Sequence, residues 1–370
     1  MNNNATPIRV GLVGVGNWAR YGHIPALRLL PGFSITAISS RSETRASAIA
    51  ADHGIPHAFS DPRTLVEHPE VDLVAVLAPA PEHAAAVRMA VAAGKAVYCE
   101  WPLTVSTADS TELLALVRRA GVRHVVGLQR TVGPSARYLR DLLSEDYVGQ
   151  LRSVRMHVSV ASFGSVRPPD LAWTLPAENF SHVLSIYGGH FMDMLFRAVG
   201  RPRTVGAVVA TQFPLLELSG TGKTFASETP DGVMVQGTLE NGALYQVQIE
   251  GGKRHNAGLQ IDITGTQGDL RISNEKSFVT THDNIIEGAN SSDGTWRILP
   301  VPARYQRIPD SSLDVSVQDL AHLYASFAEG NGAGNGGAPD FSDAVVLHRV
   351  IDAIQGSSAT GKTVEIGGTR

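Results

Sequence analysis

Short apolar runs alternate with helical patterns along the first third of the chain. The clearest helical pattern is Thr111–Ala120, where apolar residues recur on one face. Ser106 with Asp109 resembles a capping box at its start, and Gly121 fits the position just past its end. This alternation favours a parallel sheet with helices on both faces. The runs that have the length of buried strands are Ile8–Val13, Ser34–Ile38, Val71–Leu77, Ala96–Cys99 and His124–Gly127.

The pattern changes in the middle of the chain, where apolar and polar residues alternate one by one. Such alternation is typical of strands with one buried and one solvated face. Asn241-Gly242 separates two of these segments, and this dipeptide tolerates the positive backbone angles of a tight hairpin turn. The sequence therefore predicts a largely antiparallel sheet. The strands expected from the alternation are Val154–Val160, Val233–Leu239, Tyr245–Ile249, Gln260–Thr264 and Asp269–Ser273.

These patterns predict an α/β protein with two domains. Residues 1–130 are expected to form a doubly wound parallel sheet, and residues 131–370 an α+β domain with a large, mostly antiparallel open sheet. Helical patterns at Val317–Ala328 and Phe341–Gly356 close the chain. We expect these C-terminal helices to pack back on the first domain.

Composition narrows the class of protein. Hydrophobic residues at 43% and charged residues at 18% fit a globular chain, and a net charge of -4 provides no broad basic field for nucleic acid or an anionic membrane. Cys99 lies in an apolar run and is the one cysteine, so we expect a buried thiol and no internal disulfide. The N-terminus lacks the pattern of a secretory signal, which leads us to expect a cytoplasmic protein.

A glycine-rich turn follows the first expected strand. Gly14-Val15-Gly16-Asn17-Trp18-Ala19 has the spacing G-x-G-x-x-A, directly after a strand and before a helical segment. In a dinucleotide-binding turn the first glycine permits the bend, the second lets the backbone approach the pyrophosphate, and the small third residue lets the helix pack closely. The helix amides and dipole then face the phosphates. The alternative is a glycine turn without a ligand, but its position makes nucleotide binding the better interpretation. The residues of the turn that we expect to contact the nucleotide are Gly14, Gly16, Asn17 and Trp18.

The end of the second strand indicates which dinucleotide is preferred. NAD sites usually place an acid there for the ribose hydroxyls. This chain instead has Ser40 followed by Arg41, with Arg45 close behind. An arginine can form paired hydrogen bonds to a 2′-phosphate, so we expect NADP, with NAD as the alternative. Arg41 as a solvated loop residue remains the competing interpretation.

Later motifs resemble the Gfo/Idh/MocA family, the group that includes glucose-fructose oxidoreductase and inositol dehydrogenase. This resemblance implies a Rossmann domain, an enzyme that oxidises or reduces a sugar or cyclitol hydroxyl, and a homodimer or homotetramer built through the open sheet. It also implies that Pro79, His83, Glu100, Trp101 and Gln129 contact the cofactor. The segments that carry the resemblance are Gly11–Ala19, His23–Leu27, Leu77–Ala84, Ala93–Leu103, Gly127–Arg130, Gly188–Asp193, Ile263–Ile272 and Asp343–Ile354.

Two positions depart from the family pattern. Members commonly carry Glu-Lys-Pro at the end of the fifth strand, where this chain has Glu100-Trp101-Pro102. They also commonly carry an aspartate four residues before the histidine of G-x-H-x-x-D, where this chain has Ile186. Glu-Trp is also a feature of a branch similar to the fungal galactose-gene repressor, which binds a dinucleotide and a partner protein without known catalysis.

His190 is the remaining candidate for proton transfer, because an imidazole can give and take a proton near neutral pH. Asp193, one helical turn later, is expected to orient it, and Tyr187 offers a nearby hydroxyl. Each also has a structural interpretation, and His182 is expected on a surface loop.

Two functions therefore remain open. One is an oxidoreductase on a sugar-like alcohol with catalytic residues His190, Asp193 and Tyr187. The other is a non-catalytic, dinucleotide-binding regulator of a protein partner. No metal is expected, because one cysteine and the spacing of the histidines and acids match no zinc motif.

Overall fold

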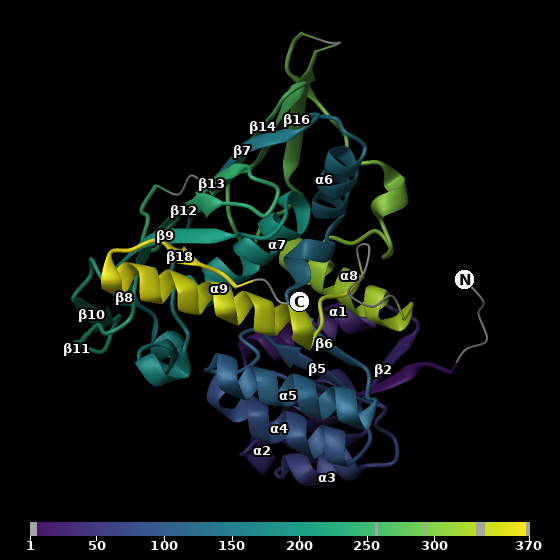
Figure 1. The fold of residues 1–370 in the computed structure, drawn as a ribbon. Helices are drawn as coiled ribbons and strands as arrows, with labels where there is room; N and C mark the ends of the chain where they lie inside the picture. Colours follow the sequence, from purple (N-terminus) through teal and green to yellow (C-terminus); the bar gives the residue numbers. More distant parts are fainter. Residues whose placement is uncertain (1–5, 256–257, 292–293, 331–336, 368–370) are drawn as a thin grey trace. The chain divides into compact units, whose positions relative to one another are not determined.

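In the computed structural model, which describes residues 6–255, 258–291, 294–330 and 337–367, the chain divides into two compact units (Figure 1). The first comprises Met1–Val132 with Arg307–Val346, and the second comprises Gly133–Gln306 with Leu347–Arg370. No helix among the described residues is both long and apolar enough to span a membrane.

The first unit is built on a six-stranded parallel sheet with the strand order β3-β2-β1-β4-β5-β6. Its central strands are buried on both faces: β4 is buried at every position. Such strands need helices on both sides, and this explains their continuous apolar runs. The strands are β1 (Ile8–Val13), β2 (Phe33–Ser39), β3 (His57–Phe59), β4 (Leu73–Val76), β5 (Ala96–Glu100) and β6 (His124–Gly127).

The helices of this unit follow from local signals in the sequence. Ser106 caps α5 by accepting the Asp109 amide, and Gly121 ends the helix with a φ of 66°. Helix α4 lies between α3 and α5 (Figure 1). Helix α8 comes from the C-terminal part of the chain and contributes Leu320 and Leu323 to the core that contains Leu12. The helical segments are η1 (Ala19–His23), α1 (Ile24–Arg28), α2 (Glu43–His53), α3 (Pro62–Glu67), α4 (Ala80–Ala92), α5 (Thr107–Ala120), η2 (Gln129–Val132) and α8 (Val315–Ala328).

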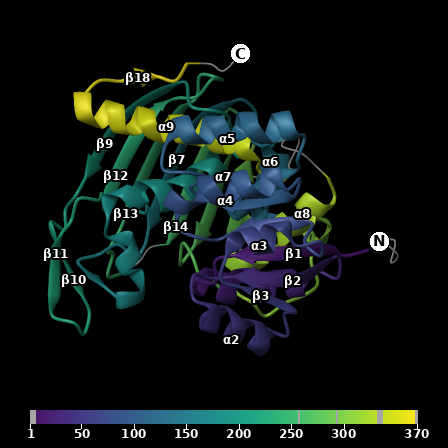
Figure 2. The ribbon, with the colours of Figure 1, turned by 90° about the horizontal axis from the view of Figure 1, so that it is seen from below.

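The second unit contains a nine-stranded sheet, whose strands lie side by side in Figure 2. Its order is β17-β16-β15-β14-β7-β13-β12-β9-β18, and it is antiparallel except where β13 pairs with β7. The expected hairpin is present: β12 and β13 pair antiparallel, and Gly242 between them has a φ of 86°. The strands are β7 (Leu151–Ser159), β9 (Thr204–Ala210), β12 (Gly232–Thr238), β13 (Leu244–Glu250), β14 (Leu259–Gly265), β15 (Gly268–Asn274), β16 (Ile285–Asn290), β17 (Arg297–Ile298) and β18 (Val364–Glu365).

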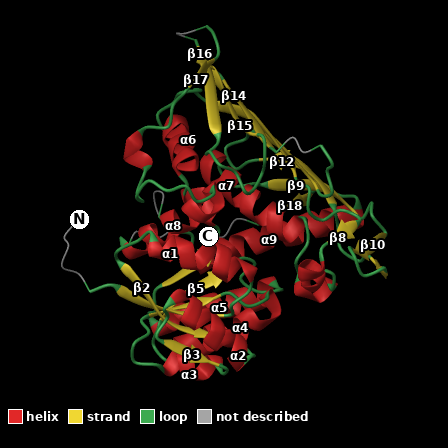
Figure 3. Ribbon diagram, turned by 180° about the vertical axis from the view of Figure 1, so that it is seen from behind, coloured by secondary structure: helices red, strands yellow, loops and turns green. Residues whose placement is uncertain are grey.

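One face of this sheet packs on helices of its own unit and the other is open. Val233 and Val235 of β12 are buried, whereas Met234 between them is 48% exposed. Helix α7 contacts β7, and its Phe196 ring packs edge-on against Tyr245 of β13. Figure 3 shows these helices on one side of the sheet. The remaining elements are α6 (Pro134–Ser144), β8 (Val166–Arg167), η3 (Pro169–Thr174), η4 (Ala177–Asn179), η5 (Leu184–Gly188), α7 (Gly189–Val199), β10 (Leu215–Leu218), β11 (Lys223–Ala226), η6 (Ala303–Tyr305) and α9 (Phe341–Thr360).

The structure therefore confirms the expected α/β fold class, with a doubly wound parallel sheet followed by a large, mostly antiparallel one. The expectation that His182 lies on the surface is wrong, because its side chain is buried. The Phe180 ring packs on it edge to face at 5.2 Å between centroids and stacks on His348 of α9 at 5.9 Å. Burial lowers the pKa of both histidines to about 4.

We predict that these two histidines make the protein less stable as the pH falls from 7 to 5. Their folded pKa lies below the value near 6.5 of an unfolded chain, so the unfolded state binds protons first in this interval. Each should remove about 2 kcal/mol of the free energy of unfolding between pH 7 and pH 5. Urea unfolding of His348→Leu at both pH values should show a smaller pH dependence than the natural chain.

The control for this measurement is His282→Leu, because His282 is exposed in the same unit. Its removal should leave the pH dependence unchanged. An equal change for both variants would contradict a role for burial.

Candidate functional site

The glycine turn after β1 has the conformation that the sequence predicts. Gly14 has a φ of 98°, and a Cβ there would lie 3.0 Å from the Ala78 nitrogen. A Cβ at Gly16 would meet no heavy atom within 4 Å, so the backbone is open to a ligand on that side. Ala19 is buried where the following helical segment begins. The bend, the open approach and the close packing that a pyrophosphate-binding turn requires are all present.

The other predicted cofactor residues follow the remaining strands of the same sheet. Ser40 follows β2, Pro79 follows β4, Glu100 ends β5 and Gln129 follows β6. Because these strands are parallel to β1, their carboxyl ends meet at the edge of the sheet that carries the glycine turn. This edge is where open α/β sheets bind their ligands.

The end of β2 provides the arginines expected to select the dinucleotide. The Arg45 Nη2 atom donates to the Val15 carbonyl at 3.3 Å, which places this guanidinium directly beside the glycine turn. The Arg41 side chain is 89% exposed, and its Nη1 lies 4.0 Å from Glu82 Oε1. The Ser40 hydroxyl accepts a long hydrogen bond of 3.4 Å from the Ser42 amide. Both guanidinium groups therefore remain at the surface of this edge.

The Glu100 carboxylate is the centre of a hydrogen-bond network. Its Oε1 accepts from Tyr98 Oη at 2.7 Å and from Trp18 Nε1 at 3.2 Å, and it lies 2.8 Å from His23 Nε2. The His23 Nδ1 atom in turn lies 2.7 Å from the Tyr324 hydroxyl of α8. Burial, and then the neighbouring Glu100 carboxylate, raise the pKa of Tyr98 and Tyr324 well above the usual range. The Glu100 Oε1 atom thus joins the glycine turn, β5 and His23, and His23 links this network to α8.

His83 joins two loops at the same edge. Its ring nitrogens lie 2.7 Å from the Ala78 carbonyl oxygen and 2.9 Å from that of Pro102. A neutral imidazole can donate to only one of them, and burial lowers the pKa of the ring. Trp101, which replaces the lysine of the family pattern, is only 4% exposed. This burial favours a packing role for the indole.

Gln129 has polar capacity to offer a ligand. It is buried in η2, and its Oε1 has no hydrogen-bond partner among the described residues. Buried polar atoms without a partner are rare in native proteins, and ligand sites are one explanation for them. Asn17, in contrast, accepts a hydrogen bond of 2.8 Å from Arg20 Nη2. The glycine turn and the Gln129 amide fit a bound dinucleotide.

Two of the three predicted catalytic residues, His190 and Tyr187, lie in the second unit against one aromatic ring. His190, near the start of α7, is 7% exposed, and its ring lies edge-on to Phe278 at 5.8 Å. The Tyr187 ring meets the same phenylalanine at 5.0 Å. The Tyr187 hydroxyl lies 2.6 Å from Ser162 Oγ, and burial raises its pKa. Phe278 therefore brings His190 and Tyr187 together, as their spacing predicts.

Asp193 has a partner that its spacing from His190 does not reveal. Its Oδ1 accepts from Arg197 Nε at 3.0 Å, one turn further along α7. Arg140 of α6 adds positive charge nearby, and burial, followed by repulsion from Arg197, lowers the pKa of Arg140 to about 10. The Asp193 carboxylate thus compensates buried arginine charge.

Sequence reasoning missed several members of these networks, among them His23, Tyr98, Tyr324 and Arg140. His23 lies in a segment that was matched only as part of the family pattern, and Tyr98 is hidden in an apolar strand. Tyr324 and Arg140 come from helices whose partners depend on tertiary packing. A histidine on the apolar face of a helical segment, as at His23, is the one signal available in advance.

Comparisons with known proteins agree with this architecture. Residues 8–128 match the family model described as oxidoreductase family, NAD-binding Rossmann fold, and residues 134–274 match that of the Gal80p C-terminal domain. The galactose/lactose metabolism regulatory protein GAL80 of Kluyveromyces lactis is 25% identical over 99% of this chain and 99% of its own. Its crystal structure has a TM-score of 0.84 and covers 97% of this chain and 91% of that one.

Named dehydrogenases are also similar. The bovine trans-1,2-dihydrobenzene-1,2-diol dehydrogenase is 30% identical over 51% of this chain and 59% of its own. Levoglucosan dehydrogenase in complex with NADH and levoglucosan shares the fold, with a TM-score of 0.84 at 22% identity over 98% of this chain and all of the other (100%).

The fold and the glycine turn define a protein of the NAD-binding Rossmann class. Within that class, residues 8–128 form a domain of the Gfo/Idh/MocA oxidoreductase type, and residues 134–274 form one of the Gal80p C-terminal type.

We predict that Glu100→Ala destabilises the first unit. The substitution leaves Trp18 Nε1, His23 and the Tyr98 hydroxyl without their shared acceptor. The expected loss in the free energy of unfolding is about 3 kcal/mol, measured by urea denaturation followed by circular dichroism. Glu112→Ala is the control, because that carboxylate pairs with Arg88 at the surface and should contribute less than about 0.5 kcal/mol. Equal losses for the two variants would show that the network contributes nothing.

Proposed function

We propose that this protein is an NADP(H)-dependent oxidoreductase that acts on a sugar, a cyclitol or a related secondary alcohol or ketone. The observation that carries the proposal is the glycine turn, with Gly14 in the left-handed region and Gly16 open. The dehydrogenases among the relatives support a reaction at a CH–OH group.

The residues that would hold the cofactor lie at the carboxyl edge of the parallel sheet. The turn from Gly14 to Trp18 would bind the pyrophosphate through backbone amides, and Arg41 and Arg45 would bind the 2′-phosphate beside Ser40. Pro79, His83, Glu100, Trp101 and Gln129 would shape the remainder of the site. When bound, a nicotinamide cofactor supplies or accepts the hydride.

Proton transfer falls to His190 in this proposal. An imidazole can take the hydroxyl proton of an alcohol or return it to a ketone. Tyr187 would position the histidine through the aromatic cluster on Phe278. Asp193 would act indirectly, by holding Arg197 on the same helix.

The second candidate is a dinucleotide-binding regulator of a protein partner. The similarity to GAL80 over nearly the whole chain favours it, and so does the replacement of the family's lysine and aspartate by Trp101 and Ile186. An indole and an aliphatic side chain cannot transfer a proton.

Assembly through the open sheet face fits either function. Val208, Met234 and Leu244 are exposed on this face, at 61%, 48% and 61%. Exposed apolar side chains on a broad face are typical of protein interfaces. We propose a homodimer or homotetramer formed by this face, in the cytoplasm.

We predict that Arg41→Ala with Arg45→Ala weakens NADPH binding about tenfold and leaves NADH binding nearly unchanged. The reason is that NADH lacks the 2′-phosphate that the guanidinium groups would bind. Isothermal titration calorimetry with both reduced dinucleotides tests this. Arg63→Ala is the control, since Arg63 is an exposed arginine of α3 in the same unit. A natural chain that binds NADH as tightly as NADPH would contradict the assigned preference.

We predict that His190→Ala lowers kcat by about 100-fold or more while the Kd for NADPH stays the same. The measurement follows the absorbance of the reduced nicotinamide with a panel of sugars, cyclitols and keto-sugars. His282→Ala controls for the loss of an exposed histidine. Tight NADPH binding without turnover on the whole panel would reject the enzyme and leave the regulator.

A further inference from the structure

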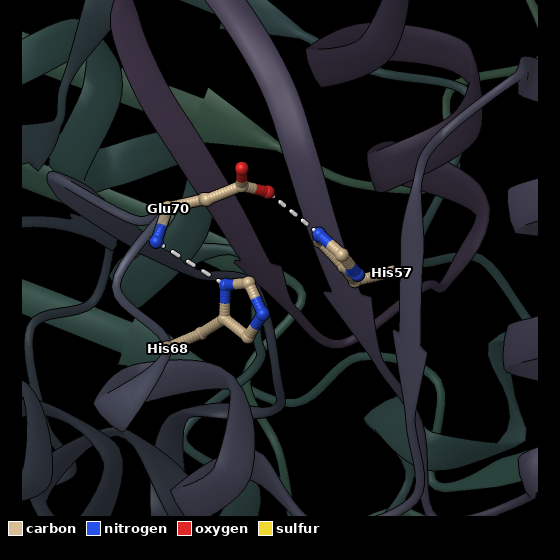
Figure 4. A group of neighbouring side chains, drawn as sticks. All are labelled: His57, His68 and Glu70. Atoms are coloured by element: carbon tan, nitrogen blue, oxygen red, sulfur yellow. Dashed lines mark hydrogen bonds and ion pairs between the residues drawn. The ribbon is translucent and has the colours of Figure 1, made fainter.

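A group of potential metal ligands lies on the first unit away from the glycine turn. His57 begins the edge strand β3, His68 follows α3, and Glu70 lies in the turn before β4. Each offers a ligand atom, and these atoms all lie within 4.8 Å of one another. Figure 4 shows the three side chains converging from these separate segments. Their distance along the chain matches no metal-binding motif, so the fold alone brings them together.

The contacts within this cluster are close. His57 Nε2 lies 2.7 Å from Glu70 Oε2, and the ring centroids of His57 and His68 are 4.2 Å apart. The His68 Nδ1 atom accepts the Glu70 amide at 3.2 Å. An ion pair would need only His57 and Glu70. The close approach of the His68 ring adds a third potential metal ligand to this pair.

The backbone that carries the ligands is fixed by further hydrogen bonds. The Glu70 carbonyl accepts from the Thr36 hydroxyl at 2.7 Å, and the His68 carbonyl accepts from Lys95 Nζ at 3.2 Å. A site that is held in place before the ligand arrives loses little conformational entropy on binding. The cluster therefore requires mainly side-chain adjustment to bind an ion.

We propose that His57, His68 and Glu70 bind one divalent transition-metal ion. Two neutral imidazoles and one carboxylate carry a single negative charge, and imidazole ligands favour Zn²⁺, Ni²⁺ or Cu²⁺ over Mg²⁺ or Ca²⁺. The ion replaces the His57–Glu70 hydrogen bond and one long hydrogen bond at His68 Nδ1. Water completes the coordination, because the cluster is partly exposed.

Neighbouring charges set a limit on the affinity. The Lys95 ammonium is held by the carbonyl oxygens of His68 and Val71, and the Arg9 guanidinium is paired with Asp72. Both cations lie close to the cluster and oppose a divalent ion. We therefore expect an affinity below that of a structural zinc site with four protein ligands.

The position in the fold indicates what the ion does. His57 is at the amino end of β3 and Glu70 precedes the amino end of β4, whereas the glycine turn follows the carboxyl end of β1. An ion at this cluster would cross-link an edge strand to the α3–β4 turn. It should therefore stabilise the first unit and leave nucleotide binding unchanged.

The test is calorimetric titration of the tag-free, full-length protein with Zn²⁺, together with thermal unfolding at increasing Zn²⁺. The natural chain should bind one equivalent and unfold at a higher temperature in its presence. The variants His57→Ala, His68→Ala and Glu70→Gln should each weaken Zn²⁺ binding about tenfold or more. Mg²⁺ and Ca²⁺ should produce no heat of binding.

The control is His157→Ala in the second unit. His157 Nε2 lies 2.9 Å from Glu250 Oε2, a similar histidine–glutamate pair, but that carboxylate binds the Lys253 ammonium in place of a second imidazole. This variant should bind Zn²⁺ as the natural chain does. Absence of a zinc equivalent in the natural chain would overturn the proposal, and so would unchanged binding by the three cluster variants that remain folded by circular dichroism.

Discussion

The first unit depends on hydrogen bonds that three side chains make to one atom, Oε1 of Glu100. Trp18 belongs to the glycine turn, Tyr98 to β5 and His23 to the helical segment after the turn. His23 extends the network to Tyr324 of α8, a helix from near the end of the chain. A partly buried carboxylate is stable only when donors replace its lost water. The network therefore fixes the turn and the distant helix against the same strand end.

The hydrogen bonds of Glu100 show that part of a catalytic sequence motif can have a structural role. In the pattern Glu-Lys-Pro the glutamate and the lysine stand next to each other, and both are easily regarded as catalytic. Here Glu100 remains while Trp101 takes the place of the lysine, and the hydrogen bonds of Glu100 explain why a glutamate is needed without any reaction. The presence of Glu100 therefore indicates that the carboxyl edge of the parallel sheet is folded as in the family. It is no evidence for catalysis.

Much of the fold was predictable because it follows from local pattern. Buried runs indicated the central parallel strands, and Asn241-Gly242 indicated the hairpin of β12 and β13. The strand β3 was missed because His57–Phe59 is short and contains a histidine, so no apolar run marks it. The helical spacing expected for His190 and Asp193 is confirmed, because both lie on α7, which begins at Gly189.

The site residues also fall into two groups: those that local sequence reveals and those that depend on tertiary packing. Gly14 was identified because its positive φ limits which residue is allowed, and Gly16 because its spacing in the turn places it where the backbone is open to a ligand. The partners of Glu100 and the Arg197 partner of Asp193 depend on how elements pack, which residue spacing does not encode. For the same reason the glycine turn serves an enzyme and a regulator equally well, since both need the dinucleotide. The distinction rests on whether the protein still moves a proton, and His190 is the residue on which that question depends.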